Sequence, residues 1–479
     1  MQASNGADHS VRTIWGFLDG FRSNVTLMGR CQLQNGDSFQ VHDVFNPSKP
    51  EMDYEFWFDT NIVEGTKCDF TIFQDGVEDT LSLLDVMFGD VWICSGQSNM
   101  GWAMRGIFNL EEELVRLRQF PNFRFIKLAF MTNETAQDDL MMDNEEIDTW
   151  TSTALENEKQ VRAFSSVCIL TASYMAEVLG KNKTFGLIQS TWAGTRIEAW
   201  FRNHQACDIP DNIDESRPQN SNGYLYNAMI HPLVRSGIKG ALWYQGESNV
   251  GWNRDKYQCA IKQLISDWKI PFEHYGTLVD DRMPFGIVQL STDKADDRDP
   301  STPMIRWHQT ADYGYLPNEE LPNTFLALSL DTYDEDRLHP RNKQLPSKRL
   351  ACSGLNMAYG LKEWPLNGPF PEAIEFNKFG NEIQVDILMD QDFTWNGNET
   401  NGFSYCCCPD LSACNGQPDQ WQQVVSLNFD GRALAMKIPS CSIGLAYLWK
   451  TTPVIGNVLP MYAANEFGLP AAPWMRQIN

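Results

Sequence analysis

Several short polar segments follow apolar runs in this sequence, and two of them hold residues that could carry out acyl transfer. Ser98 follows one apolar run, and His339 closes the polar segment after another. A serine hydroxyl is a weak nucleophile until a neighbouring base takes its proton, and histidine suits that task. Asp336, three residues before His339, can fix the imidazole tautomer and stabilise the imidazolium. We therefore predict Ser98, His339 and Asp336 as a catalytic triad, with Asp334 or Glu247 as the alternative third member.

Two further polar segments supply hydrogen-bond donors. Gly194 lies in the segment 191–196, and Asn249 ends the segment 245–249. A tetrahedral intermediate carries an oxyanion that needs preorganised donors. We predict that the backbone N–H groups of Ser98 and Gly194 and the side-chain amide of Asn249 form this oxyanion hole.

The same segments contain candidates for substrate binding, namely Arg196, Gln97 and Gln245. An arginine fork suits a carboxylate, although Arg196 could equally anchor a neighbouring loop. Gln97 and Gln245 fit the bracing of loops better than chemistry. Among the other histidines, His231 is more typical of a structural residue, and His308 is a weaker candidate for the base.

The polar segments end predicted strands of an α/β domain. Apolar runs alternate with helical patterns, which is typical of a mainly parallel sheet with helices on both faces. Functional sites of such sheets lie at the carboxyl ends of the strands. We predict strands at 91–94, 185–190, 238–244, 285–290 and 325–330, and helices at 109–120, 165–179, 255–269 and 341–359. Asn109 is the predicted cap of the first helix, and Gly180 the predicted stop of the second.

Short strands cut by turn signals lie on either side of this domain. They occur before Val91, for example at 71–73 and 81–84, and after about residue 366, at 382–388, 422–427, 433–438 and 443–449. We predict an N-terminal β domain at 1–90, a catalytic α/β domain at 91–365 and a C-terminal β region at 366–479.

The composition excludes several classes of function. Lys and Arg number 38 and Asp and Glu number 62, so the net charge is 38 − 62 = −24. This charge repels the phosphates of nucleic acids and anionic lipid surfaces. No apolar stretch of about 18 residues suggests membrane insertion. No cysteine or histidine spacing suggests a zinc site or another metal site, and we expect no cofactor.

Cysteines and glycosylation motifs favour an oxidising, secretory compartment. Cys31 and Cys68 fit a bridge in the N-terminal domain, and Cys207 and Cys259 fit one in the catalytic domain. Cys94 and Cys168 lie in apolar segments and are typical of buried free thiols. Sequence alone does not assign partners in the C-terminal cluster. N-glycan acceptor motifs occur at Asn24, Asn133, Asn182 and Asn398. The first residues lack a hydrophobic signal core, which we interpret as a processed or trimmed start.

The polar segments also resemble a known family. Gly96-Gln-Ser-Asn-Met100, Trp192-Ala-Gly-Thr195, Gly246-Glu-Ser-Asn249 and Asp336-Arg-Leu-His339 are similar to the four blocks of SGNH hydrolases. The longer strings 91–100, 225–233, 243–249 and 305–312 resemble the sialate O-acetylesterase family, and the likeness runs from Thr13 to Pro473. It implies an SGNH-like fold, a secreted or lysosomal location, and removal of O-acetyl groups from sialic acids or sialoglycans, chiefly at the 9-position.

One departure and several alternatives accompany this resemblance. Ala193 replaces a glycine common in the family, so the turn there must avoid positive φ. Related blocks occur in esterases of other acetylated carbohydrates such as xylan, and a catalytically inactive glycan-binding protein would also fit the flanking β regions. An acidic compartment would tend to protonate His339, since an unperturbed imidazole has a pKa of about 6.5.

Overall fold

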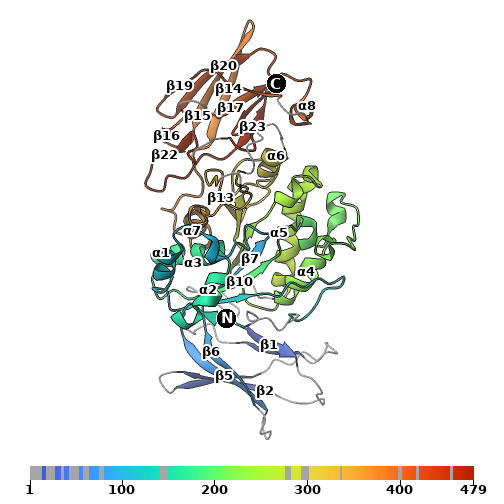
Figure 1. Ribbon diagram of the computed structural model, residues 1–479, viewed down its shortest axis with the longest axis vertical. Coiled ribbons are helices and arrows are strands. Elements are labelled where there is room, and N and C mark those ends of the chain that lie inside the picture. The colour runs from blue at the N-terminus through green and yellow to red at the C-terminus, as the bar shows by residue number, and fades with distance from the viewer. Residues whose placement is uncertain are drawn as a thin grey trace.

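The computed structural model describes residues 13–17, 27–33, 37–42, 53–57, 64–74, 80–140, 149–275, 282–292, 301–334, 337–397, 402–416, 420–453 and 457–478. Its parts follow one another along the long axis of the molecule (Figure 1). The N-terminal strands lie at one end, the α/β domain lies in the middle, and the C-terminal strands lie at the other end.

A mainly parallel sheet forms the centre of the α/β domain. In the described residues its strand order is β13-β12-β11-β7-β10-β8-β9, and only β9 is antiparallel to its neighbour. The strands are β7 (Asp90–Gly96), β8 (Phe123–Lys127), β9 (Thr151–Ser152), β10 (Phe185–Thr191), β11 (Gly240–Tyr244), β12 (Phe285–Gln289) and β13 (Thr324–Leu328). Residues of β7, β10, β11, β12 and β13 are buried throughout, as expected of strands covered on both faces.

Helices cover the two faces of this sheet (Figure 1). On one face α3 packs against α7, where Ser347 Oγ donates to the carbonyl oxygen of Val167. On the other face Trp268 of α5 packs edge-on against Trp243 of β11. The helices of the domain are α1 (Leu110–Leu117), α2 (Glu158–Ala163), α3 (Ser166–Leu179), α4 (Tyr224–Met229), α5 (Tyr257–His274), α6 (Ser301–His308) and α7 (Gln344–Tyr359). The predicted α/β fold class is confirmed.

The predicted helix ends are correct for α3 and partly wrong for α1. Ser165 caps α3 by accepting a hydrogen bond from Cys168 N, and Gly180 ends the helix with φ +117°. Asn109 precedes α1, but it has φ +54° and its side chain makes no capping hydrogen bond. The predicted capping role of Asn109 is therefore wrong, because this left-handed backbone differs from the extended one that a capping side chain uses.

Antiparallel strands precede the α/β domain, in the order β3-β2-β5-β6 beside the pair β1-β4. They are β1 (Thr13–Phe17), β2 (Leu27–Leu33), β3 (Ser38–His42), β4 (Asp53–Trp57), β5 (Lys67–Gln74) and β6 (Thr80–Met87). Lys183 Nζ joins these strands to the central domain, since it lies 2.8 Å from Glu64 Oε2 and 2.7 Å from Asp90 Oδ2.

The C-terminal region is built from antiparallel sheets with the orders β14-β15-β20-β19 and β18-β17-β21-β23, and from the pair β16-β22. Alternate side chains of β15 and β20 are buried, as in half-exposed sheets. The elements are β14 (Pro371–Phe379), β15 (Glu382–Met389), β16 (Phe393–Trp395), β17 (Phe403–Cys406), α8 (Leu411–Gly416), β18 (Trp421–Gln423), β19 (Leu427–Asp430), β20 (Ala433–Pro439), β21 (Gly444–Tyr447), β22 (Met461–Ala463) and β23 (Trp474–Gln477). The predicted strand 422–427 is divided between β18 and β19.

The disulfides confirm two expected pairings and correct one expectation. Cys31–Cys68 and Cys207–Cys259 are bonded as predicted. Cys94 and Cys168, predicted to be free thiols, form a disulfide with their Cα atoms 5.8 Å apart. Their apolar neighbours come from β7 and α3, which pack together, so the two buried thiols meet. The C-terminal cluster contains Cys406–Cys414 and Cys407–Cys441.

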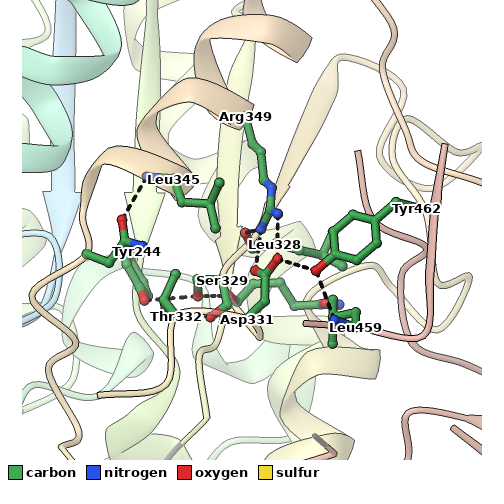
Figure 2. Close-up of polar contacts among 11 residues, drawn as sticks. Tyr244, Leu328, Ser329, Asp331, Thr332, Leu345, Arg349, Leu459 and Tyr462 are labelled. Atoms are coloured by element: carbon green, nitrogen blue, oxygen red, sulfur yellow. Dashed lines mark hydrogen bonds and ion pairs between the residues drawn. The ribbon is translucent and has the colours of Figure 1, made fainter. Parts of the chain in front are cut away.

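Buried polar contacts tie the C-terminal region to the central domain. Arg306 of α6 donates to the carbonyl oxygens of Lys450 at 2.6 Å and Thr451 at 2.8 Å. Figure 2 shows Asp331, just after β13, between Arg349 of α7 and Tyr462 of β22. The segment after β13 is therefore anchored both to α7 of the central domain and to β22 of the C-terminal region.

Candidate active site

Ser98 and His339 meet at the carboxyl edge of the central sheet. Ser98 Oγ lies 2.7 Å from His339 Nε2, although the two residues are 241 positions apart in the sequence. Ser98 is half-buried in the turn after β7, and His339 lies in the segment between β13 and α7. This distance and arrangement match a serine nucleophile beside its general base.

A glycine shapes the turn that presents Ser98. Gly96 ends β7 with φ +130°, and a Cβ atom there would lie 2.2 Å from the carbonyl oxygen of Tyr244 in β11. A larger residue would therefore have to push β11 away from β7. The close approach lets the chain leave the sheet sharply, directly before Ser98.

The imidazole ring of His339 is held by an aromatic neighbour. The indole of Trp102 stacks on it with ring centroids 5.3 Å apart and an interplanar angle of 16°. Asp336, the predicted orienting carboxylate, lies outside the described residues. The alternative, Asp334, is occupied by Arg341, whose side chain and backbone N–H donate to it in three hydrogen bonds of 2.7 to 2.9 Å. These bonds lower the pKa of Asp334 below its ordinary value.

The backbone at Gly194 suits an oxyanion donor. Gly194 is exposed with φ +71°, and apart from its two chain neighbours no described residue lies within 4 Å of the position that a Cβ would take. Ala193 does not adopt positive φ, so the substitution of the family's glycine causes no strain. The backbone groups of Gly194 and Ser98 remain our proposed oxyanion donors.

The side chain of Asn249, the third predicted oxyanion donor, makes its hydrogen bonds inside the protein. Its Nδ2 donates to Glu198 Oε2 at 2.9 Å and to the carbonyl oxygen of Trp252 at 3.2 Å. Its Oδ1 accepts from Ile197 N at 2.9 Å, and the residue is 0% exposed. Because both amide protons are used inside the protein, Asn249 in this structure fixes the loop before Ile197 and is not presented to a substrate oxyanion.

The two glutamines likewise brace loops. Gln97 is buried, and its Oε1 accepts from Ser248 N at 3.2 Å. Gln245 is also buried, and its Nε2 donates to the carbonyl oxygen of Thr195 at 3.1 Å. In this structure Gln97 and Gln245 therefore brace the polar segments against one another, the role that the sequence favoured for them.

Arg196 lies over an exposed aromatic ring. Its guanidinium carbon is 3.7 Å from the ring centroid of Trp252, which is 39% exposed. Such a stacked arginine keeps its edge free for hydrogen bonds. Nearby on the Gly194 loop, Trp192 packs against the exposed ring of Phe130 with centroids 5.0 Å apart. These aromatic side chains follow strands β8, β10 and β11 and so line the same edge of the sheet as Ser98.

The rival histidines are engaged elsewhere. His231 Nδ1 lies 2.9 Å from the carbonyl oxygen of Gln137, in keeping with a structural role. His308 Nδ1 lies 2.6 Å from Asp312 Oδ1, at the end of α6. The partner of Ser98 is His339.

Sequence reasoning missed two polar residues behind the serine and histidine. Asn99 donates to Glu247 Oε1 at 2.5 Å, and Lys343 Nζ donates to Asn99 Oδ1 at 2.5 Å. Asn99 directly follows Ser98, the predicted nucleophile, and that position in the motif was the available signal. Nothing in the sequence near Lys343 indicates its partner.

Comparisons with known proteins agree with this geometry. Residues 88–347 match the family described as carbohydrate esterase, sialic acid-specific acetylesterase. Residues 374–478 match the sialate O-acetylesterase C-terminal domain. A human sialate O-acetylesterase is 33% identical over 97% of this chain and 89% of its own length. The chain belongs to the sialate O-acetylesterase family. A mouse member of this family is 34% identical over 98% of this chain and 92% of its own length.

A solved structure supports the fold of this family member. The carbohydrate acetylesterase XAC1771 from Xanthomonas citri aligns with 98% of this chain and 95% of its own, with a TM-score of 0.77 at 22% identity. This likeness extends through the flanking β regions. Among the described helices, none has the length and apolar character needed to cross a membrane.

Proposed function

We propose that this protein is a serine esterase that hydrolyses O-acetyl esters of sialic acids, chiefly 9-O-acetyl esters, to acetate and sialic acid. The observation that carries the proposal is the 2.7 Å contact of Ser98 Oγ with His339 Nε2 at the carboxyl edge of the sheet. The family to which the chain belongs supplies the substrate class.

The first half of the reaction forms an acetyl-enzyme. Ser98 Oγ attacks the acetyl carbonyl carbon while His339 Nε2 takes the hydroxyl proton. The backbone N–H groups of Ser98 and Gly194 donate to the oxyanion of the tetrahedral intermediate. The bond between the carbonyl carbon and the sugar oxygen then breaks, and His339 gives its proton to that oxygen, which leaves as the sugar hydroxyl.

The second half releases acetate. His339 takes a proton from water while the water oxygen attacks the acetyl carbon of the Ser98 ester. The bond between the acetyl carbon and Ser98 Oγ then breaks, His339 returns the proton to Oγ, and acetate leaves. The stack of Trp102 on the imidazole keeps the ring in one plane through these transfers. In our proposal Asp336 completes the triad by holding the imidazole tautomer.

Recognition of the sugar must be local. The chain carries a net charge of −24, and a sialic acid is itself an anion, so the overall field does not attract it. Arg196, stacked on Trp252, offers a positive fork beside the Gly194 loop. We propose that this fork binds the sialic acid carboxylate.

The substrate assignment is tested by acetate release from matched esters. The protein should hydrolyse 9-O-acetyl sialic acid faster than the 4-O-acetyl isomer and much faster than acetylated xylan, measured from acidic to mildly basic pH. Acetate release from xylan with none from sialic acids would redirect the proposal to other carbohydrate esters. Glycan binding without any acetate release would support an inactive binding protein.

Replacement of Arg196 should affect charged substrates selectively. We expect Arg196→Lys to raise KM for 9-O-acetyl sialic acid roughly 10- to 100-fold, because a charge-assisted bidentate contact is lost. KM for the uncharged ester p-nitrophenyl acetate should stay the same. Arg217→Lys, which changes an exposed arginine on a nearby loop, serves as the control. Equal KM values for wild type and Arg196→Lys with the sialic acid ester would exclude this role.

We also propose that the protein resides in the secretory pathway, either secreted or lysosomal. Disulfides such as Cys94–Cys168 persist in oxidising compartments. Of the candidate glycan acceptors, Asn182 is exposed and Asn133 is half-buried, while Asn24 and Asn398 lie outside the described residues.

A further inference from the structure

The side chain of Asn99 joins the loops that carry the nucleophile and the base. Its Nδ2 donates to Glu247 Oε1 at 2.5 Å and to the carbonyl oxygen of Leu338 at 3.0 Å. Asn99 directly follows Ser98, and Leu338 directly precedes His339. One buried amide therefore fixes the two loops relative to each other, and with them the contact between Ser98 and His339.

Lys343 holds this amide from behind. Its Nζ donates to Asn99 Oδ1 at 2.5 Å, and the residue is 1% exposed at the start of α7. The ammonium group lies 5.3 Å from the ring centroid of Tyr244 and 6.0 Å from that of Trp102, the residue stacked on His339. A lysine is rarely buried so completely, so its position calls for a role beyond packing.

The charged groups around Lys343 come from two loops. Glu247 and Asp334 favour its protonated form, but Asp334 is itself paired with Arg341. Removal from water outweighs both carboxylates and lowers the pKa of Lys343 to about 7. The neighbouring Tyr244 has a pKa raised by burial, so its hydroxyl stays neutral in the same range. Lys343 therefore changes its charge near neutral pH.

We propose that Lys343 is a positioning residue: its ammonium group anchors Asn99, and Asn99 holds the Ser98 and His339 loops in register. The inference rests on the proposed esterase function. When Lys343 loses its proton, its hydrogen bond to Asn99 is no longer charge-assisted. The Glu247 carboxylate also loses the attraction of a nearby positive charge. The loops then loosen, and the proton transfer from Ser98 to His339 slows.

Lys343→Met tests the role, with Lys348→Met as the matched control on the exposed side of the same helix. We expect Lys343→Met to lower kcat for acetate release roughly 10- to 100-fold, as misplaced catalytic groups do, while KM changes less than about twofold. Wild-type kcat should fall as the pH rises through the pKa of Lys343, and this alkaline decline should be absent in Lys343→Met. Lys343→Arg, which keeps the charge, should recover most of kcat. The control should behave as wild type.

A folded Lys343→Met protein with wild-type kcat and an unchanged pH profile would overturn the proposal. If Lys343→Met does not fold, Asn99→Asp decides instead. This variant keeps the acceptor for Lys343 but removes the donor to Glu247 and Leu338. A similar loss of kcat supports the proposal, and full activity overturns it.

Labelling of Ser98 by a fluorophosphonate separates this inference from the proposed function. The label reacts with an activated serine whatever the natural ester is. Labelling that depends on Lys343, in a protein that releases no acetate from sialic acids, would retain the positioning role and reject only the substrate. Acetate release by wild type with labelling independent of Lys343 would reject only the positioning role.

Discussion

Replacement of Ser98 by alanine should lower kcat for acetate release by about 10⁴- to 10⁶-fold, the largest effect that we expect. No other hydroxyl is placed 2.7 Å from His339 Nε2 in the described residues. His339→Ala should cost a similar amount, because the nucleophile and the base act as one unit. The double variant should therefore be little worse than either single one. Steady-state acetate release and fluorophosphonate labelling measure both effects.

Ser216→Ala is the control for this series, since Ser216 is exposed and its hydroxyl donates to Asp214 instead of to His339. It should keep wild-type kcat and be labelled like wild type. A folded Ser98→Ala protein that hydrolyses acetyl esters at the wild-type rate would reject Ser98 as the nucleophile.

Replacement of Arg349 by methionine should destabilise the protein by about 3–5 kcal/mol, because it leaves Asp331 buried without its ion-pair partner. Arg349 donates to both carboxylate oxygens of Asp331, at 2.6 and 2.7 Å, and also to the carbonyl oxygen of Leu328 at 2.7 Å (Figure 2). Both side chains are buried. Chemical denaturation, followed by tryptophan fluorescence, gives the change in the unfolding free energy.

A second substitution separates the unpaired charge from lost packing. Arg349→Met combined with Asp331→Leu removes both charges and should restore part of the stability, since apolar replacements of buried pairs are often tolerated. Lys348→Met, at the exposed neighbouring position of α7, should change stability by less than about 0.5 kcal/mol. An Arg349→Met protein as stable as wild type would show that the ion pair does not hold this region.

The sequence was sufficient to predict five strands of the central sheet, namely β7, β10, β11, β12 and β13, and the residues at their ends, whereas β8 and β9 were not predicted. Ser98 and His339 follow apolar runs, and parallel strands bring the ends of such runs to one edge whatever the intervening chain does. The family blocks narrowed the choice of serine and histidine further. Local pattern and chain topology together determine these features, so one sequence suffices to infer them.

Contacts between distant side chains were harder to predict. Cys94 and Cys168 sit among apolar residues, a setting equally typical of free thiols, and only the packing of β7 against α3 pairs them. Asn249 has the residue type of an oxyanion donor, but Glu198 and Trp252 take both its amide protons. Lys343 lies 244 positions from Asn99, and no sequence pattern links the two. These partners depend on three-dimensional packing that composition and spacing do not encode.

The hydrogen bonds of Asp331 determine whether the α/β domain can be separated from the C-terminal sheets. The segment from Asp331 to His339 starts at a carboxylate that accepts a hydrogen bond from Tyr462 at 2.8 Å. Arg306, in the same domain, donates to the backbone of Lys450 and Thr451. A truncation at residue 365 would remove Tyr462, one of the residues that hold the start of the segment leading to His339, the proposed base. The C-terminal sheets therefore contribute to the position of His339. A shortened protein would need another hydrogen-bond donor to Asp331 in place of Tyr462.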